Sequence, residues 1–273
     1  MLTLIGSYEH NEWRMVYSIG YDIGSSFVKA SIVDISTGKC MVSAISPDQE
    51  MPTEVPERDW AEQDPEMWWH NVKESTFRLF QNSEIRPAEI QAIGISYQMH
   101  GLVLIGRNQQ VLRPAIIWCD SRAVGVGTAA FKDIGEEKCL NHLLNSPGNF
   151  TASKLGWVKE HEPDIFSQVS GVLLPGDFIA MKLTGETTTT PSGLSEGIFW
   201  DFANNEKAGF LMDYFDFDQA MFPRVIPNFS TEIGVSAQVA EELGFPAGTP
   251  VSYRAGDQPN NAFALKVLHP GEI

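Results

Sequence analysis

Residues 17–45, which read YSIGYDIGSSFVKASIVDISTGKCMVSAI, place three short runs with strand character one after another. The first run, Tyr17 to Ile23, is apolar and is followed by a Gly-Ser-Ser turn. The second, Phe27 to Ile35, alternates roughly between apolar and polar residues, and the third, Lys39 to Ile45, follows a Ser-Thr-Gly turn. Strands joined by such short turns pair as hairpins. The fold is therefore predicted to begin with a β-meander.

A helix is predicted after the loop that follows this meander. Asp64 is a good N-cap, and Pro65 suits the first helical position. Beyond them, apolar residues recur at helical spacing. Trp68 and Trp69 lie on this apolar face, so we expect them to pack in the core rather than to stack on a ligand.

Strand-like and helical segments are mixed along the remaining chain. Further strands are expected at residues 90–96, 101–106, 115–118 and 249–253, and helical segments near 152–161, 176–183, 206–214 and 237–243. A meander followed by mixed strands and helices is typical of an α/β domain. The predicted fold class is therefore α/β.

The composition limits the partners that the protein can have. Its 273 residues carry a formal net charge of −16, and a surface this acidic repels nucleic-acid phosphates and anionic lipid. We therefore expect neither a nucleic-acid partner nor a membrane partner. A phosphate-bearing cofactor can still bind through backbone N–H groups and a metal ion.

Cysteine usage and the N-terminus indicate the compartment. Cys40, Cys119 and Cys139 have neither metal-ligand spacing nor the pattern of a secreted disulfide framework. The first residues lack the basic and long apolar segments of a signal peptide or a membrane anchor. We expect a cytoplasmic location, with residues 1–14 forming a disordered extension.

The first candidate site is the turn after the first strand. Asp22 lies at the end of the strand, Gly24, Ser25 and Ser26 form the turn, and Lys29 lies just beyond it. A carboxylate here can hold a hydrated Mg²⁺ while the amides and hydroxyls of the turn face phosphate oxygens. The same pattern also occurs in plain hairpin turns, so the motif alone favours a structural role.

Two further candidates follow predicted strands. Met99 and His100 offer an imidazole to a polyhydroxylated ligand, although a lone histidine is more often satisfied by local hydrogen bonds. Asp120 and Arg122 come just after a strand-like run that ends in Trp118. A structural ion pair and a corner that organises a ligand pocket fit these two residues equally well.

The last candidate, Asp257, lies between a predicted strand and a stretch compatible with a helix. There it can serve as a helix N-cap, or it can accept a proton from a hydroxyl that attacks phosphorus. Phosphoryl transfer requires positioning, a metal ion and such a base rather than covalent chemistry.

The order of these motifs resembles the FGGY family of carbohydrate kinases. A D-x-G-[TS]-x-x-x-K hairpin, Q-M-H-G, W-x-D-x-R and G-D-x occur at residues 22–29, 98–101, 118–122 and 256–258. Residues 150–157 (FTASKLGW) and 173–186 (LLPGDFIAMKLTGE) are similar to further segments of the family. The likeness runs from about Tyr17 to the C-terminus, and Met99-His100-Gly101 is most similar to the xylulokinase branch.

The resemblance implies an actin-like ATPase domain of the ribonuclease H-like type, with helices on both faces of a mixed sheet and an insertion. It implies a sugar-binding domain at residues 15–255 and the start of a nucleotide-binding domain at residues 256–273. Members of the family are typically much longer, so we expect this chain alone to be weakly active or inactive.

The implied activity is ATP- and Mg²⁺-dependent phosphorylation of a sugar, with D-xylulose giving D-xylulose 5-phosphate. Asp257 would be the catalytic base, and Asp22 and Asp257 would hold the metal ion. The resemblance implies phosphate binding for Asp22, Gly24, Ser25, Ser26 and Lys29, and substrate binding or shaping of the pocket for Met99, His100, Asp120, Arg122 and Gln258.

Departures from the family pattern leave alternatives open. Many xylulokinases read D-N-A-A at the base, whereas this chain has Gln258 and Pro259 after Asp257. Gly176 replaces a lysine that is usual in L-P-K-D-Y, and Ser25 replaces the commoner threonine. The residue after the base commonly contacts the sugar, so a ribulose, fuculose or gluconate kinase stays open, as does a non-catalytic sugar-binding remnant. A homodimer also stays open, because an exposed apolar surface favours self-association.

Overall fold

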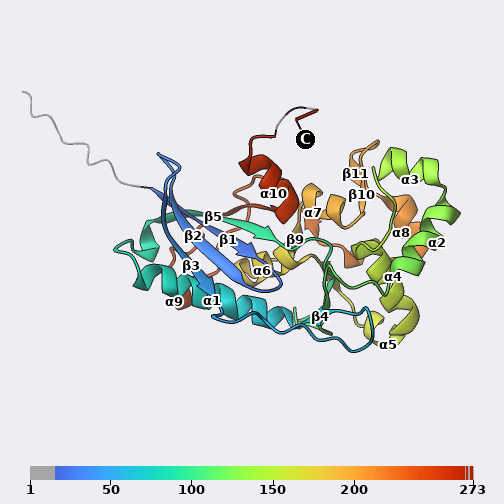
Figure 1. Cartoon of the computed structure of the whole chain (residues 1–273), viewed down its shortest axis with the longest axis horizontal. Coiled ribbons are helices and arrows are strands. Elements are labelled where there is room, and N and C mark those ends of the chain that lie inside the picture. Colours follow the sequence, from blue (N-terminus) through green and yellow to red (C-terminus); the bar gives the residue numbers. More distant parts are fainter. Residues whose placement is uncertain (1–15, 268, 270, 273) are drawn as a thin grey trace, which may run out of the picture.

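The computed structural model describes residues 16–267, 269 and 271–272. The predicted extension at residues 1–14 lies outside this part of the chain. Figure 1 shows two neighbouring regions, a sheet flanked by helices and a mostly helical region beside it.

The centre of the first region is a five-stranded sheet with the strand order β13-β5-β1-β2-β3. Its strands are β1 (Tyr17–Ile23), β2 (Val28–Asp34), β3 (Cys40–Ser46), β5 (Ile90–Tyr97) and β13 (Val251–Gly256). β2 pairs antiparallel with both β1 and β3, which confirms the predicted meander. β5 runs parallel to β1 and β13 runs parallel to β5, so the sheet is mixed, as predicted.

The parallel strands bring three distant segments of the chain to one edge of the sheet. Ile23 pairs with Tyr97, and Tyr97 pairs with Gly256, at the last residues of the three strands. Ligands of open α/β sheets bind beyond the carboxyl ends of such strands. The segments that begin at Gly24, Gln98 and Asp257 therefore lie at the same edge.

Helices lie on both sides of the sheet. α1 (Pro65–Gln81) and α6 (Pro175–Thr184) pack against one face, and α9 (Ala237–Leu243) packs beside α1. α10 (Asp257–Ala264) contacts β5 and β13 and lies on the opposite side from α1 and α9 (Figure 1).

The start of α1 is the one that the sequence predicts. The carboxylate of Asp64 accepts the backbone N–H of Glu66 at 2.9 Å and so caps the helix. Trp68 is fully buried and Trp69 is 7% exposed. Both tryptophans belong to the core under the sheet, as predicted.

The mostly helical region has a core of its own. Its helices are α2 (Val124–Ile134), α3 (Glu136–His142), α4 (Thr151–His161), α5 (Pro163–Phe166), α7 (Pro191–Glu196) and α8 (Gly209–Phe215). Their buried apolar side chains, among them Leu155, Phe199 and Met212, form a cluster separate from the one under the sheet. This second core corresponds to the expected insertion.

Short strand pairs connect the two regions and shape the loops. The pairs are β4 (Glu62–Gln63) with β7 (Ala115–Ile116), β6 (Val103–Ile105) with β8 (Gly171–Leu173), β9 (Thr188–Thr189) with β12 (Arg224–Val225), and β10 (Trp200–Asp201) with β11 (Glu206–Lys207). Two 3₁₀ turns, Pro87–Glu89 and Gln219–Met221, complete the elements. Within the described residues, no helix has both the length and the apolar character that a membrane span requires.

The described helices differ from the prediction in two ways: one begins later than expected, and four (α2, α3, α5 and α7) were not predicted. The expected helix at 206–214 begins only at Gly209, because Glu206–Lys207 pairs with β10 instead. The helix α2 was not predicted, since Gly125 and Gly127 weaken its helical pattern. Gly127 is required there, because a Cβ atom would collide with the backbone of Gly148.

Candidate active site

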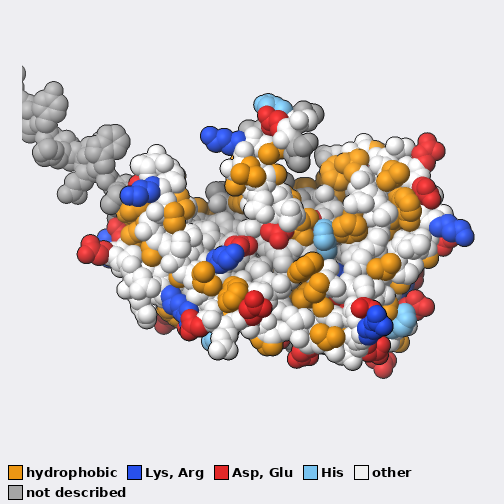
Figure 2. Space-filling model, viewed as in Figure 1, with side chains coloured by type: hydrophobic (Ala, Val, Ile, Leu, Met, Phe, Trp, Pro, Cys, Tyr) orange, Lys and Arg blue, Asp and Glu red, His pale blue; other side chains and the backbone are white. Residues whose placement is uncertain are grey.

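Asp257 lies at the point where β13 meets α10. It is the first residue of α10, and Gly256 takes the N-cap position, so Asp257 is not the helix cap that the sequence allowed. Its side chain is partly exposed and lines two pockets at once. In Figure 2, a histidine and several apolar side chains gather in the hollow beside α10.

The first pocket has a volume of about 650 Å³ and lies between the β1–β2 turn and α10. Its lining includes all the residues predicted to bind phosphate, namely Asp22, Gly24, Ser25, Ser26 and Lys29. The N–H of Gly24 donates to the carbonyl of Phe27 at 3.0 Å and closes the turn. Lys29 Nζ lies 3.5 Å from Asp22 Oδ2, and both side chains are substantially exposed to solvent. The structure therefore places a carboxylate, an ammonium and a polar turn around one open space.

The second pocket has a volume of about 370 Å³. It is lined by Gln98, Met99, His100, Trp118, Asp257 and Gln258, four of which the sequence predicts as site residues. Apolar walls with a few convergent polar groups are typical of small-molecule sites. The thioether and indole here can pack against carbon atoms of a sugar, while the carboxylate and imidazole can bind its hydroxyls.

The backbone at His100 is held in the left-handed conformation, with φ of 62°. Lys154 Nζ donates to the carbonyls of His100 at 2.8 Å and Ile117 at 2.9 Å, which joins the two loops that form the pocket. The ring of Phe150 meets the imidazole edge-on, with the centroids 4.5 Å apart. His100 Nδ1 lies 3.1 Å from the carbonyl oxygen of Glu196 and donates to it. Local hydrogen bonding therefore satisfies this one ring nitrogen.

Two carboxylates, those of Asp22 and Asp257, face the first pocket. Burial raises the pKa of Asp257 above its usual value, the N–H of Gln258 lowers it, and the nearby charge of Asp22 raises it further. The described residues contain no cluster of three or more metal-binding side chains, so Asp22 and Asp257 do not belong to a closed protein cage. A pair of carboxylates on an open polar pocket fits Mg²⁺, which keeps several of its waters.

Asp120 and Arg122 do not line either pocket. Both side chains are fully buried, and Arg122 Nη2 lies 2.7 Å from Asp120 Oδ2. Arg122 Nη1 lies 2.7 Å from Glu62 Oε1, and its guanidinium carbon lies 3.9 Å from the centre of the Trp60 ring. Of the two alternatives that the sequence left open, this geometry is that of a structural ion pair.

Trp118 and Lys154 belong to the site but were not predicted as site residues. Trp118 is 54% exposed, lines the second pocket and donates from Nε1 to Ser25 Oγ at 3.3 Å, so it connects the two pockets. Lys154 is fully buried beneath the pocket loops. The tryptophan in W-x-D-x-R and the lysine in FTASKLGW were visible in the motifs, but no local pattern indicates their long-range contacts.

The departure at Gly176 has a steric explanation. A Cβ atom at this position would collide with the ring of Tyr97, which is itself fully buried at the end of β5. A lysine cannot occupy position 176 while Tyr97 keeps this place.

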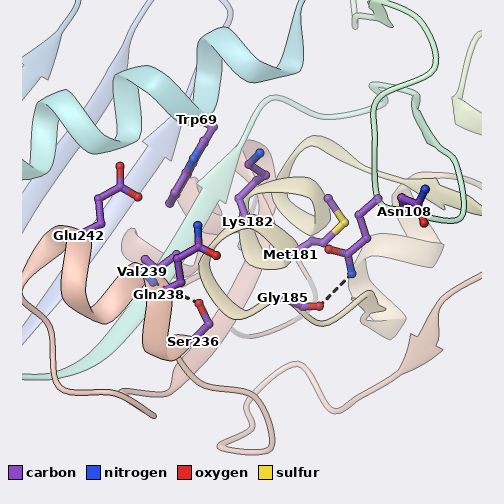
Figure 3. A pocket seen from close by; sticks show the side chains of 10 residues that line it. Trp69, Asn108, Met181, Lys182, Gly185, Ser236, Gln238, Val239 and Glu242 are labelled. Carbon is purple, nitrogen blue, oxygen red and sulfur yellow. Dashed lines mark hydrogen bonds between the residues drawn. The ribbon is translucent and has the colours of Figure 1, made fainter.

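A third pocket, of about 280 Å³, lies away from Asp257 and is lined by residues of α1, α6 and α9 (Figure 3). Its charged side chains Lys182 and Glu242 each take part in an ion pair at 2.8 Å. They are therefore already neutralised within the protein, and the pocket does not combine a carboxylate with the polar turn found at Asp257.

Proteins of similar sequence include xylulose kinases. A xylulose kinase from Escherichia coli is 31% identical over 250 residues, which cover 92% of this chain and 50% of the relative. One from Klebsiella pneumoniae is 30% identical over 254 residues, with coverage of 93% and 51%. The chain thus spans about half the length of these relatives.

Solved structures show the same fold. A xylulose kinase from Rhodospirillum rubrum superimposes with a TM-score of 0.84 and is 27% identical, covering 93% of this chain and 52% of that one. A structure described as a xyloylose kinase from Brucella ovis also gives a TM-score of 0.84, with 29% identity and coverage of 93% and 51%. The predicted α/β fold of the actin-like type is thereby confirmed.

The family model for the N-terminal domain of the FGGY family of carbohydrate kinases matches residues 17–264, which is most of the chain. The match includes the meander, both pockets and Asp257. This chain belongs to the FGGY family of carbohydrate kinases.

Proposed function

We propose that this chain is the sugar-binding part of an ATP-dependent kinase that converts D-xylulose into D-xylulose 5-phosphate. The observation that carries the proposal is that Asp257 lines both pockets, the one at the β1–β2 turn and the one at Met99 and His100. A base for phosphoryl transfer must reach the attacking hydroxyl and lie beside the phosphorus. The printed names of the relatives support D-xylulose as the sugar.

On the sugar side, Asp257 accepts the proton of the attacking hydroxyl. Met99, Trp118 and His100 hold the sugar against this carboxylate, and Gln258 reaches it from the first turn of α10. The raised pKa of Asp257 brings its basicity closer to that needed near neutral pH.

On the phosphate side, Gly24, Ser25 and Ser26 present amides and hydroxyls to the donor, and Lys29 adds positive charge. Asp22 and Asp257 would hold Mg²⁺ at the edge of this pocket. When bound, ATP would supply the phosphoryl group, and Mg²⁺ would neutralise the negative charge that develops during the transfer.

We assign residues 15–255 to the sugar-binding domain and residues 256–273 to the beginning of the nucleotide-binding domain. We also propose a cytoplasmic location, which is supported by the three unpaired cysteines and by the use of ATP.

Two alternatives concern the substrate and the activity. Gln258 replaces the asparagine of many xylulokinases at a position that lines the sugar pocket, which favours testing other sugars. A non-catalytic sugar-binding role would keep the second pocket and need no phosphate turn, whereas this chain retains both.

The test is calorimetric titration of the chain with D-xylulose, D-ribulose, L-ribulose, gluconate and glycerol. The parent chain is compared with Asp257→Ala and with Asp213→Ala, which removes an exposed carboxylate on α8. We expect saturable binding that favours D-xylulose, weakened about tenfold or more by Asp257→Ala and unchanged by Asp213→Ala.

The other outcomes of the sugar titration each bear on one part of the proposal. Preference for another sugar would keep the family and change the substrate. Binding that Asp257→Ala does not weaken would remove Asp257 from the sugar site, and no binding of any sugar would count against a preformed sugar site in this chain.

A further inference from the structure

Glu196 is a buried acid that neither the motif order nor the proposed mechanism explains. It is the last residue of α7, and only 6% of its surface is exposed. Its Oε1 accepts the backbone N–H of His100 at 3.3 Å, and its own carbonyl accepts the imidazole Nδ1–H of His100 at 3.1 Å. One residue of the inserted region therefore holds the histidine of the sugar pocket at both its backbone and its ring.

The other oxygen of Glu196 reaches the residue that precedes the proposed base. A Cβ atom on Gly256 would lie 2.5 Å from Glu196 Oε2 and would collide with the side chain of Met99. Position 256 therefore has no room for a side chain. Through this contact Glu196 and Met99 both pack against the start of α10, which carries Asp257.

The environment of Glu196 favours its uncharged form. Oε2 is shielded from solvent and has no hydrogen-bond partner among the described residues. The charges of Asp177 and Asp257 both act on Glu196, and Asp177 is paired with Arg254 at 2.7 Å. Burial raises the pKa of Glu196 well above its usual range, and the charges of these two aspartates raise it further. The N–H of His100 and the hydroxyl of Tyr97 oppose the effect.

We propose that Glu196 is a positioning residue that acts as a neutral carboxylic acid and fixes the Met99–His100 loop against the start of α10. Because a carbonyl oxygen can only accept, the contact between Nδ1 and the Glu196 carbonyl requires the Nδ1–H tautomer of His100. Nε2 then carries the lone pair and can accept a hydrogen bond from a sugar hydroxyl. Glu196 thus presets both the shape and the hydrogen-bonding polarity of the sugar pocket, a consequence that rests on the function proposed above.

The experiment compares three variants of the whole chain. Glu196→Gln has the shape of the neutral acid and keeps an acceptor for the His100 N–H, whereas Glu196→Ala removes that acceptor. Glu241→Gln makes the same chemical change on an exposed residue of α9 and is the matched control. Should Glu196→Ala fail to fold, Glu196→Asp replaces it, because the shorter acid cannot reach the same N–H.

The first readout is the ¹⁵N NMR signal of the His100 ring, assigned with His100→Gln and recorded without sugar across the pH range. In the parent chain, burial lowers the pKa of His100, the hydrogen bond to the Glu196 carbonyl raises it, and the charge of Lys154 adds a smaller lowering effect. We expect the Nδ1–H tautomer in the parent and in Glu196→Gln. The backbone carbonyl at position 196 remains in Glu196→Ala, but the side chain no longer holds the N–H of His100. We therefore expect the imidazole to leave this carbonyl part of the time and to show a mixture of tautomers.

The second readout is the dissociation constant for D-xylulose. We expect it to rise about tenfold in Glu196→Ala, and Glu196→Gln to restore it to within about threefold of the parent value. An unchanged His100 ring in Glu196→Ala would overturn the positioning role. If Glu196→Gln weakened D-xylulose binding as much as Glu196→Ala, the claim that Glu196 acts in its neutral form would be overturned. If even the parent binds no sugar, the proposed function fails, while the ring signal still decides the role of Glu196.

Discussion

The buried cluster around Arg122 offers the sharpest test of what the W-x-D-x-R motif does. Arg122→Met keeps much of the side-chain volume but removes the cation that faces Asp120 and Glu62. Both partner carboxylates are more than nine-tenths buried, so water does not replace the lost cation, while Glu62 keeps its second ion pair, with Arg113 at 2.5 Å. Removing one member of a buried ion pair costs about 3–5 kcal/mol.

Contacts that Asp120 keeps in the variant narrow the expected loss of unfolding free energy. Asp120 keeps two backbone donors, the N–H of Ala61 at 2.6 Å and the N–H of residue 122 at 2.9 Å. We therefore expect the lower part of the range, about 3 kcal/mol. For a chain of this size that loss lowers the midpoint of thermal unfolding by about 6–12 °C.

The assay is urea unfolding followed by tryptophan fluorescence, together with D-xylulose titration at a temperature where the variant is folded. Arg224→Met is the control, because Arg224 also pairs with two carboxylates, Glu186 and Glu232, but its side chain is 53% exposed. Exposed pairs contribute less than about 1 kcal/mol. A loss of less than 1 kcal/mol in Arg122→Met, combined with lost sugar binding, would show that the guanidinium contacts the ligand and would refute the structural role.

Three more predictions follow from the pKa values and the exposed surface. Burial lowers the pKa of Lys154 from 10.5 to about 8, so the folded chain loses this proton at a lower pH than the unfolded chain does. The free energy of unfolding of the parent, measured relative to Lys154→Met, should therefore rise by up to about 3 kcal/mol between pH 8 and 10.5. A difference that stays constant with pH in urea unfolding would contradict this prediction. The raised pKa of Asp257 means that its charge destabilises the folded chain as the pH rises above 3.8, so Asp257→Asn should raise the unfolding temperature at pH 7 but not at pH 3. Phe263 and Leu265 are 55% and 78% exposed, so light scattering should detect self-association of the parent at high protein concentration. The double variant Phe263→Ser, Leu265→Ser should reduce this association, whereas the control Phe202→Ser should not. A monomeric parent would exclude self-association through Phe263 and Leu265.

Local signals in the sequence predicted much of the sheet region. The alternation in residues 17–45, the short turns and the cap at Asp64 each depend on neighbouring residues, and β1, β2, β3 and α1 lie where these signals place them. The helix α2 was missed because its glycines, which the close approach to Gly148 requires, weaken the same local signals.

The residue types of the candidate site were also visible in the motifs. Asp22, His100 and Asp257 were singled out because each lies at or just after the end of a predicted strand, and parallel pairing then brings these strand ends to one edge. That these residues act together at one site was implied only by the resemblance, since periodicity does not state which strands are neighbours.

What the sequence by itself determined was the order of the motifs, and through it the family and the residues that carry polar chemistry. Only the tertiary structure decided that Asp257 faces two pockets, that Arg122 is buried against Asp120, and that Glu196 holds His100. The physical reason is the range of the interactions: turns and caps are determined within a few residues, whereas burial and pairing depend on side chains that meet only when the two cores pack together.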